Sequence, residues 1–188
     1  KWLETDSFEE AFDKFNDNVG EIEQNLTEPL ILENLIVNGD FSQGNIGFVP
    51  SGSGSTISVV DGKLNVLAGG QYRGTQRPTT TILNNKYYLR AKIDGTTNIY
   101  FGFRAGSPSV YKKINGVEVV SLVRQATAAS NNIEVLDNRA SGNTVYTVDE
   151  LLMVDLTTTF GAGNEPTKEE MDELMKVVPN QWWDGELT

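Results

Sequence analysis

The sequence predicts a mainly β protein: a jelly-roll sandwich between an N-terminal helix and a short C-terminal helix. From Asn34 onward, short apolar alternations are separated by Gly-rich or Asn/Asp-rich turns, a pattern typical of antiparallel sandwiches and barrels. The 188 residues can bury one full core. We therefore expect an amphipathic, coiled-coil-like helix in residues 1–30, a sandwich in residues 31–160 and a turn-helix segment in residues 161–188.

The spacing of apolar residues predicts the N-terminal helix. Intervals of 4, 3, 4, 3 and 4 positions place six side chains on one seam of a helix: Phe8, Phe12, Phe15, Val19, Ile22 and Leu26. The seam can pack on the protein's own sandwich or against other copies of the chain. Its phenylalanines make a wide core that fits three strands more easily than two, so we expect a homotrimer.

Eight strands are expected in the sandwich, which is jelly-roll size. They lie near Leu35–Val37, Thr56–Val60, Lys63–Ala68, Tyr87–Ile93, Ile99–Arg104, Val117–Val123, Ile133–Leu136 and Thr144–Leu156. Tight turns are predicted at Asp61-Gly62, Asp94-Gly95 and Asn115-Gly116, because these dipeptides accept the positive φ of hairpin turns.

The C-terminal segment has the signals of a capped helix. Thr167 followed by Glu170 predicts a capping box, and Pro179 ends the helix. One apolar face follows from the helical period: Met171, Leu174, Met175 and Val178. We expect the adjacent Trp182 and Trp183 to dock a terminal segment rather than to hold a ligand.

The composition excludes several classes of function. The chain has no cysteine and no histidine, so catalytic triads and His-based zinc sites cannot form. No pair of acids has a spacing that distinguishes it from surface acids, and we expect no enzyme activity. No apolar run approaches the roughly 20 residues that span a bilayer, so membrane insertion is not expected. The chain begins at Lys1 rather than Met, which indicates a fragment of a longer protein.

The charge is unevenly distributed. The net charge is −11, but residues 31–160 carry eleven basic and ten acidic side chains, so the acidic excess lies at the two ends. Binding to nucleic acid requires a basic stripe that neutralises phosphates, and we expect none. The nearly neutral sandwich suits an uncharged ligand.

Two stretches resemble known families. The string DLTTTFGAGNEPTKEEMDELMKVVPNQWWDG, residues 155–185, resembles a segment found in tail and minor structural proteins of bacteriophages and prophages of Gram-positive bacteria. The strings NLIVNGDFSQG, residues 34–44, and VDELLMVDL, residues 148–156, are similar to the first and last strands of jelly-roll carbohydrate-binding modules.

These resemblances imply a multimeric tail fibre or baseplate protein of the virion that contacts other tail proteins. Its lectin-like sandwich would contact bacterial cell-wall glycan outside the host cell. Many modules of the second kind hold a structural calcium between their first and last strands. Here Asp40 and Asp149 could supply oxygens, although Ser42 stands where an acid often lies. No other cofactor is expected.

Strand alternation gives the glycan-binding candidates, because sugars bind to flat aromatic surfaces and planar polar groups. In KYYLRAKI, Tyr88 and Arg90 point away from the apolar face, and in NIYFGFR, Tyr100 and Arg104 do the same. A hairpin through Asp94-Gly95 would place these four residues on one sheet face. Tyr72, in a Gly-flanked loop, is a second candidate. Alternatively, the tyrosines lie under a second layer or in an oligomer contact, where Tyr and Arg are also enriched.

The sequence thus predicts a non-enzymatic tail protein that contributes to host-surface recognition by weak, multivalent glycan binding. One alternative is a purely structural tail component that binds no glycan. Another is a binding module detached from a cell-wall hydrolase.

The trimer is tested by sedimentation or light scattering of the full chain. We expect about three times the chain mass of 20.7 kDa, and we expect Phe12→Asp with Phe15→Asp to lower it, because charges in the seam oppose its burial. A clean monomer at high micromolar concentration would show that the seam packs on the protein's own sandwich.

Overall fold

The structure, a computed structural model, describes residues 31–104, 110–139 and 143–187. The expected N-terminal helix and its six seam residues lie outside this part of the chain. The described strands, in chain order, are β1 (Leu32–Asn34), β2 (Val49–Ser51), β3 (Thr56–Val60), β4 (Lys63–Ala68), β5 (Arg73–Thr80), β6 (Lys86–Phe103), β7 (Val110–Gln125), β8 (Ser130–Asp137), β9 (Thr144–Asp155) and β10 (Gly185–Leu187). The prediction of a mainly β sandwich is confirmed.

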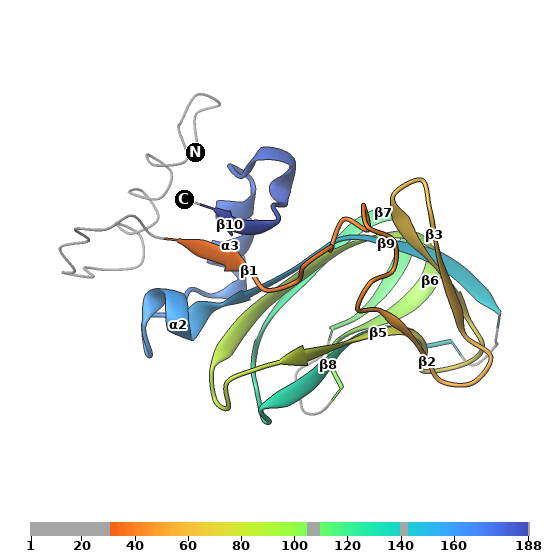
Figure 1. Cartoon of the computed structure of the whole chain (residues 1–188), viewed down its shortest axis with the longest axis horizontal. Helices are drawn as coiled ribbons and strands as arrows, with labels where there is room; N and C mark the ends of the chain where they lie inside the picture. The colour runs from red at the N-terminus through yellow and green to blue at the C-terminus, as the bar shows by residue number, and fades with distance from the viewer. Residues whose placement is uncertain (1–30, 105–109, 140–142, 188) are drawn as a thin grey trace.

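The long strand β6 organises the main sheet. β7 pairs with one edge of β6 along most of its length, from Lys86 to Phe101. On the other edge, residues 87–95 pair with β9, and residues 99–103 pair with β8. The sheet therefore divides at residues 96–98 into one branch of β9, β4 and β3 and another of β8, β5 and β2. Figure 1 shows β5 and β8 in one layer and β9 in the layer that faces it.

Two of the three predicted turns are wrong. Gly95 and Gly116 are cross-strand partners inside the β6–β7 hairpin, so neither Asp94-Gly95 nor Asn115-Gly116 ends a strand. A Cβ atom at Gly95 would lie 2.9 Å from the Cβ atom of Tyr146 on β9. The glycine therefore permits a close approach where β6 changes partners. The third turn, Asp61-Gly62, joins β3 to β4, and both of these strands have the predicted bounds.

Other strand assignments also differ from the structure: β2, β5 and β10 were not predicted, and Tyr87–Ile93 and Ile99–Arg104, predicted as two strands, form the single strand β6. The first strand spans Leu32–Asn34 rather than Leu35–Val37. β5 was not predicted, because it contains Pro78 and lacks apolar alternation. Pro78 is exposed.

A C-terminal segment covers the outer face of the β9 branch. It comprises α2 (Leu156–Phe160), α3 (Lys168–Met175), the 3₁₀ turn η1 (Pro179–Gln181) and β10, which pairs with β1. The capping box is confirmed, since Thr167 and Glu170 each accept a hydrogen bond from the other's backbone N–H. The predicted apolar face of the helix is buried against the sheet together with Trp183. Trp183 therefore docks the C-terminal segment, as predicted. In the described residues, no helix is long and apolar enough to cross a membrane.

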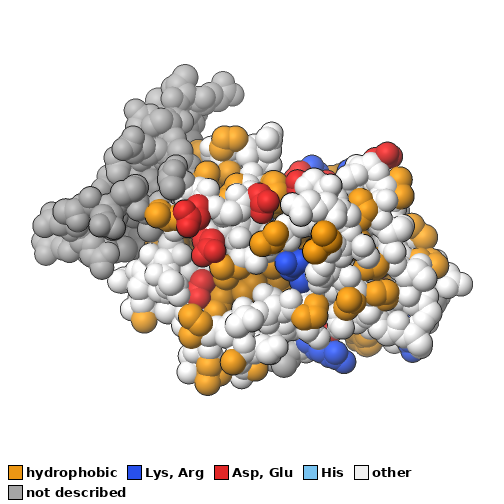
Figure 2. Space-filling model, in the orientation of Figure 1, with side chains coloured by type: hydrophobic (Ala, Val, Ile, Leu, Met, Phe, Trp, Pro, Cys, Tyr) orange, Lys and Arg blue, Asp and Glu red, His pale blue; other side chains and the backbone are white. Residues whose placement is uncertain are grey.

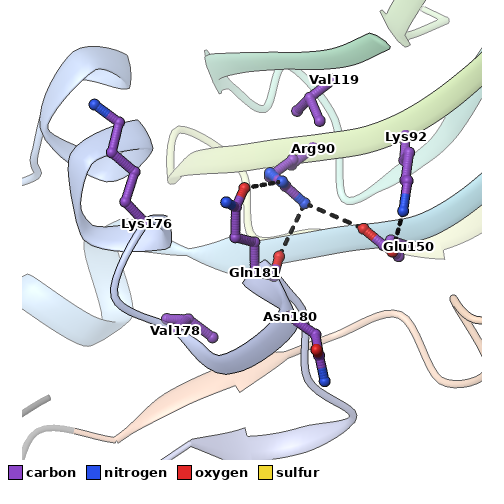
Figure 3. Close-up of a pocket in the computed structure, with 8 residues that line it drawn as sticks. All are labelled: Arg90, Lys92, Val119, Glu150, Lys176, Val178, Asn180 and Gln181. Atoms are coloured by element: carbon purple, nitrogen blue, oxygen red, sulfur yellow. Dashed lines mark hydrogen bonds and ion pairs between the residues drawn. The ribbon is translucent and has the colours of Figure 1, made fainter. Parts of the chain in front are cut away.

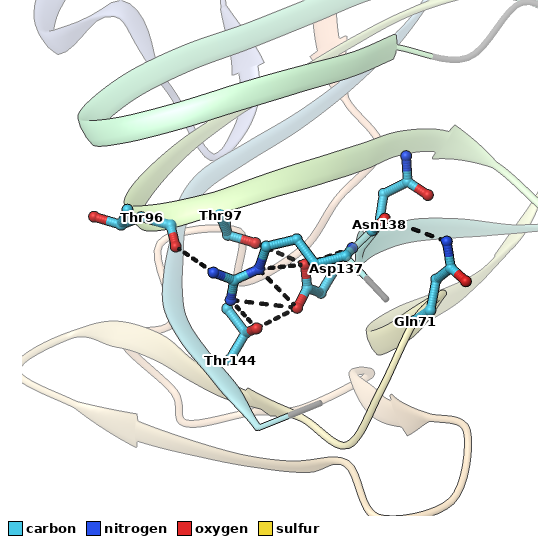
Figure 4. Close-up of polar contacts among 7 residues, drawn as sticks. Gln71, Thr96, Thr97, Asp137, Asn138 and Thr144 are labelled. Carbon is cyan, nitrogen blue, oxygen red and sulfur yellow. Dashed lines mark hydrogen bonds and ion pairs between the residues drawn. The ribbon is translucent and has the colours of Figure 1, made fainter. Parts of the chain in front are cut away.

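A buried carboxylate lies where the sheet divides (Figure 4). The side chain of Asp137, at the end of β8, is fully buried. It accepts hydrogen bonds from the Thr97 hydroxyl of β6 at 2.9 Å and from the Thr144 hydroxyl of β9. Arg139 forms an ion pair with Asp137 at 3.2 Å and donates to the Thr96 carbonyl at 3.1 Å. Asp137 thus connects β8 to both strands at the division.

Replacing Asp137 by Ala should lower the free energy of unfolding by about 3 kcal/mol, because Thr97, Thr144 and Arg139 lose a shared buried acceptor. Urea denaturation measures this change, with Asp184→Ala as the control, because Asp184 is exposed. Equal stability of the two variants would show that the network does not hold the branches together.

Candidate functional site

Three of the five predicted glycan-binding residues are buried: Tyr88, Arg90 and Tyr100. Tyr88 and Arg90 point away from the main core, as predicted, but the C-terminal segment covers them, and they are 0% and 2% exposed. The Tyr88 hydroxyl donates to Asp172 of α3 at 2.7 Å. Burial, with the neighbouring Asp172 carboxylate, raises the pKa of Tyr88. The expectation that these two residues share an exposed face with Tyr100 and Arg104 is therefore wrong.

The outer face of the other branch brings the remaining candidates together. Phe101, Phe103, Ile133 and Val135 point into the main core, so the residues between them on β6 and β8 point to the opposite face. β5 and β7 flank these strands. We call this surface the tyrosine face and define it by Tyr72, Gln76, Tyr100, Arg104, Tyr111, Asn132 and Glu134.

Three tyrosines lie at one end of the tyrosine face. Tyr100 and Tyr111 are cross-strand partners, and their ring centroids are 5.3 Å apart in an edge-to-face arrangement. Desolvation, with the Tyr72 and Tyr100 phenols, raises the pKa of Tyr111. Tyr72 and Tyr111 are 52% and 59% exposed, whereas Tyr100 is 9% exposed. Tyr72 and Tyr111 therefore offer ring surface to a ligand.

Glu134 supplies a buried acceptor on the same face. Its side chain is only 7% exposed, and its ion-pair partner is Arg104, whose Nε lies 3.6 Å from Oε1 and whose side chain is 66% exposed. Within the described part of the chain, no N–H or O–H group donates a hydrogen bond to this carboxylate. Burial raises the pKa of Glu134, and Arg104 partly opposes the rise. Among the described residues its charged partner is Arg104, and a donor-rich ligand would add hydrogen bonds to the buried carboxylate.

Two amides continue the polar part of the tyrosine face. Gln76 is the cross-strand partner of Glu134, and Asn132 lies two residues before Glu134 on β8. Asn132 Nδ2 donates to Gln76 Oε1 at 3.4 Å. The partner of Glu134 on β6 is Gly102, which places no side chain beside the carboxylate. The arrangement combines aromatic rings, a carboxylate, a guanidinium and two amides.

Sequence reasoning found Tyr72, Tyr100 and Arg104 but missed Tyr111 and Glu134. Tyr111 was missed because the strand around it was placed to begin at Val117, beyond Asn115-Gly116. Glu134 lies in a predicted strand, IEVL, where its alternation with Ile133 and Val135 was a usable signal. Its burial beside Arg104 depends on contacts between distant strands.

The residues proposed for calcium do not fit that ion. The Asp40 carboxylate already accepts hydrogen bonds from the Ser42 amide and hydroxyl, at 3.1 and 2.9 Å. The described residues contain no group of three or more acidic side chains that could hold a metal. Calcium takes six to eight oxygen ligands, so Asp40 and Asp149 supply too few.

Replacing Arg104 by Gln should raise the pKa of Glu134 further, because it removes the cation that opposes the effect of burial. The side-chain carboxyl ¹³C shift, followed against pH, measures this value. Lys113→Gln, on β7, is the matched control and should leave the pKa unchanged. A pKa of Glu134 at or below its ordinary value in the unmodified protein would contradict the burial described above.

Comparisons with known proteins show the fold. No protein-family model matches the sequence, and no curated protein matches it either. An arabinose-bound GH51 α-L-arabinofuranosidase aligns with 78% of this chain and 30% of its own, at 12% identity and a TM-score of 0.52. The CBM22-1–GH10 modules of Clostridium thermocellum xylanase 10B align with 67% of this chain and 28% of their own, at 10% identity and a TM-score of 0.48. A family 16 carbohydrate-binding module aligns with 64% of this chain and 99% of its own, at 19% identity and a TM-score of 0.45. The first of these shares the fold, and this chain spans less than a third of that enzyme.

Proposed function

We propose that this protein is a non-catalytic glycan-binding module that uses the tyrosine face. The observation that carries the proposal is the Glu134 carboxylate, which is 7% exposed and has one charged partner at 3.6 Å. It lies on the same outward face as two exposed tyrosine rings. Sugar hydroxyls are donors that can satisfy such a carboxylate, and pyranose C–H faces pack on aromatic rings.

The charge of the surroundings favours a neutral ligand. Residues 31–160 carry eleven basic and ten acidic side chains, and Figure 2 shows side chains of both signs among uncharged ones on the visible face. On the tyrosine face, Arg104 and Glu134 offset each other in charge. The exposed Arg104 can donate to ligand oxygens, whereas Gln76 and Asn132 can both donate and accept.

The tyrosine face lacks the groups that glycoside hydrolysis requires. Retaining and inverting glycosidases use two carboxyl groups at a set separation. Among the described positions of β5, β6, β7 and β8 that point outward on this branch, Glu134 is the one carboxylate. Asp137 points to the opposite side and is held by Thr97, Thr144 and Arg139. The face therefore supports binding without hydrolysis.

A location in a phage tail is a further part of the proposal, and it rests on the resemblance of residues 155–185. Binding by a few tyrosines is weak, since each aromatic contact contributes on the order of 1 kcal/mol. Adhesion to a bacterial cell wall would then require several copies, as in a homotrimer or a fibre. The competing role is a tail component that binds no glycan.

Replacing Tyr111 by Ala should weaken binding to a neutral oligosaccharide about fivefold, and adding Tyr72→Ala should weaken it about 25-fold, because each ring contributes about 1 kcal/mol. The binding constant is obtained by NMR titration against a panel of neutral cell-wall oligosaccharides. Tyr111→Phe is the matched control, because it keeps the ring and should retain most of the affinity.

Lowering the pH gives an independent readout. Sugar hydroxyls donate to the ionised carboxylate, so affinity should fall as the pH drops through the pKa of Glu134, which burial raises above its ordinary value.

Unchanged affinity in the Tyr72/Tyr111 double variant would place the binding site elsewhere. Absence of binding to every glycan in the panel would favour the purely structural role.

A further inference from the structure

A second site lies on the opposite branch of the sheet, between β7 and the C-terminal segment. Two hollows of about 360 and 440 Å³ adjoin there. Both are lined by Arg90, Val119, Lys176 and Gln181, so they lie next to each other and are treated together as one groove. We call it the C-terminal groove. It does not include any residue of the tyrosine face.

A buried guanidinium forms the centre of the C-terminal groove (Figure 3). The Arg90 side chain is 3% exposed and donates to the backbone carbonyl and side-chain Oε1 of Gln181, at 2.9 and 2.8 Å. These partners are neutral. The Glu150 carboxylate lies 3.9 Å from Arg90 and only 2.8 Å from Lys92. One carboxylate therefore serves two cations, which leaves positive charge uncompensated at this end of the groove.

The lining as a whole is cationic in a protein whose net charge is −11. Lys92, Lys112, Lys168 and Lys176 line the groove with Arg90, against the acids Glu150 and Asp172. Three further acids pair with lysines but do not line the groove: Glu118 with Lys112, Glu169 with Lys168 and Glu173 with Lys176. Exposed ion pairs contribute about 0–1 kcal/mol each, so these lysines can exchange their partners for an anion in the groove.

The backbone around the C-terminal groove is strained. Glu150, Asn180 and Gln181 have φ values of 50°, 57° and 54°, and all three line the groove. Left-handed conformations cost roughly 1 kcal/mol or more for residues such as Glu150 and Gln181, and less for asparagine. The strain is concentrated where Gln181 holds Arg90 in place and where Glu150 lies between Arg90 and Lys92. Such clusters occur at binding sites more than at purely structural positions.

We propose that the C-terminal groove binds a phosphate group. Gln181 already occupies two donors of the Arg90 fork, so the planar, bidentate recognition that suits a carboxylate is less available. The lysine ammonium groups are compact charges with rotatable donors, which suit the tetrahedral oxygens of a phosphate. The phosphate can be free in solution or can belong to a phosphorylated sugar or polyol.

The test is a titration of the ¹⁵N-labelled full chain with sodium phosphate, with glycerol 3-phosphate and, at matched ionic strength, with sodium acetate. We expect saturable shifts of amides around Gln181, Lys176 and Val119 with both phosphates, and weaker ones with acetate. Tighter binding of glycerol 3-phosphate would identify an esterified phosphate as the ligand, and equal binding would identify the free anion.

Variants locate the phosphate. Lys176→Gln and Lys112→Gln should each weaken binding about fivefold, because each removes one exposed ammonium contact worth about 1 kcal/mol. Lys113→Gln is the control, since Lys113 is exposed on β7 next to Lys112 but does not line the groove. The proposal is overturned by the absence of saturable shifts, by acetate binding as tightly as phosphate, or by an equal loss in the control.

Discussion

The Asp137 carboxylate joins the two branches of the sheet at the point where β6 exchanges β9 for β8. Burying an ionised carboxylate costs several kcal/mol unless charged and hydrogen-bonding groups surround it. Here Thr97 comes from β6, Thr144 from β9 and Arg139 from the chain after β8. Tyr146 adds a second connection, because its hydroxyl, from β9, donates to the Val135 carbonyl of β8 at 2.6 Å. The division turns one sheet into two facing layers, and the rest of the molecule depends on this geometry.

Division of the sheet also gives β6 two different outer faces. On the β9 side, Tyr88 and Arg90 are buried beneath α3 and η1, where they hold the C-terminal segment through Asp172 and Gln181 and where Arg90 lines the C-terminal groove. Burial opposes ionisation of Asp172, but hydrogen bonds, the strongest from Lys168, hold its pKa below the usual value. On the β8 side, Tyr111 and Arg104 stay exposed beside the buried Glu134. β6 thus runs beneath the C-terminal segment at one end and beside the candidate glycan-binding surface at the other.

Local patterns in the sequence predict those parts of the structure that depend on near neighbours. Alternation identifies which side chains of residues 87–93 and 99–103 point into the core, and the Thr167–Glu170 spacing identifies the helix start. The Asp94-Gly95 dipeptide shows the limit, because a local turn signal is overridden when β7 pairs along nearly the whole of β6. The covering of Tyr88 by residues more than 80 positions later is equally inaccessible to local reasoning. For the same reason, the sequence could place Tyr72, Tyr100 and Arg104 as candidates but could not bring them to one face with Glu134.

The six tyrosines of the chain allow a direct test of the claim that the tyrosine face binds neutral glycans. Tyr72 and Tyr111 are exposed on that face, whereas Tyr87, Tyr88 and Tyr146 are at most 1% exposed and serve as internal references. The measurement is the aromatic ¹H–¹³C NMR spectrum of the tyrosine-labelled protein during titration with a neutral cell-wall oligosaccharide that it binds. The ring signals of Tyr72 and Tyr111 should shift with a common saturation curve while those of the three buried tyrosines stay in place. Saturable binding that leaves the Tyr72 and Tyr111 signals unmoved would contradict the account.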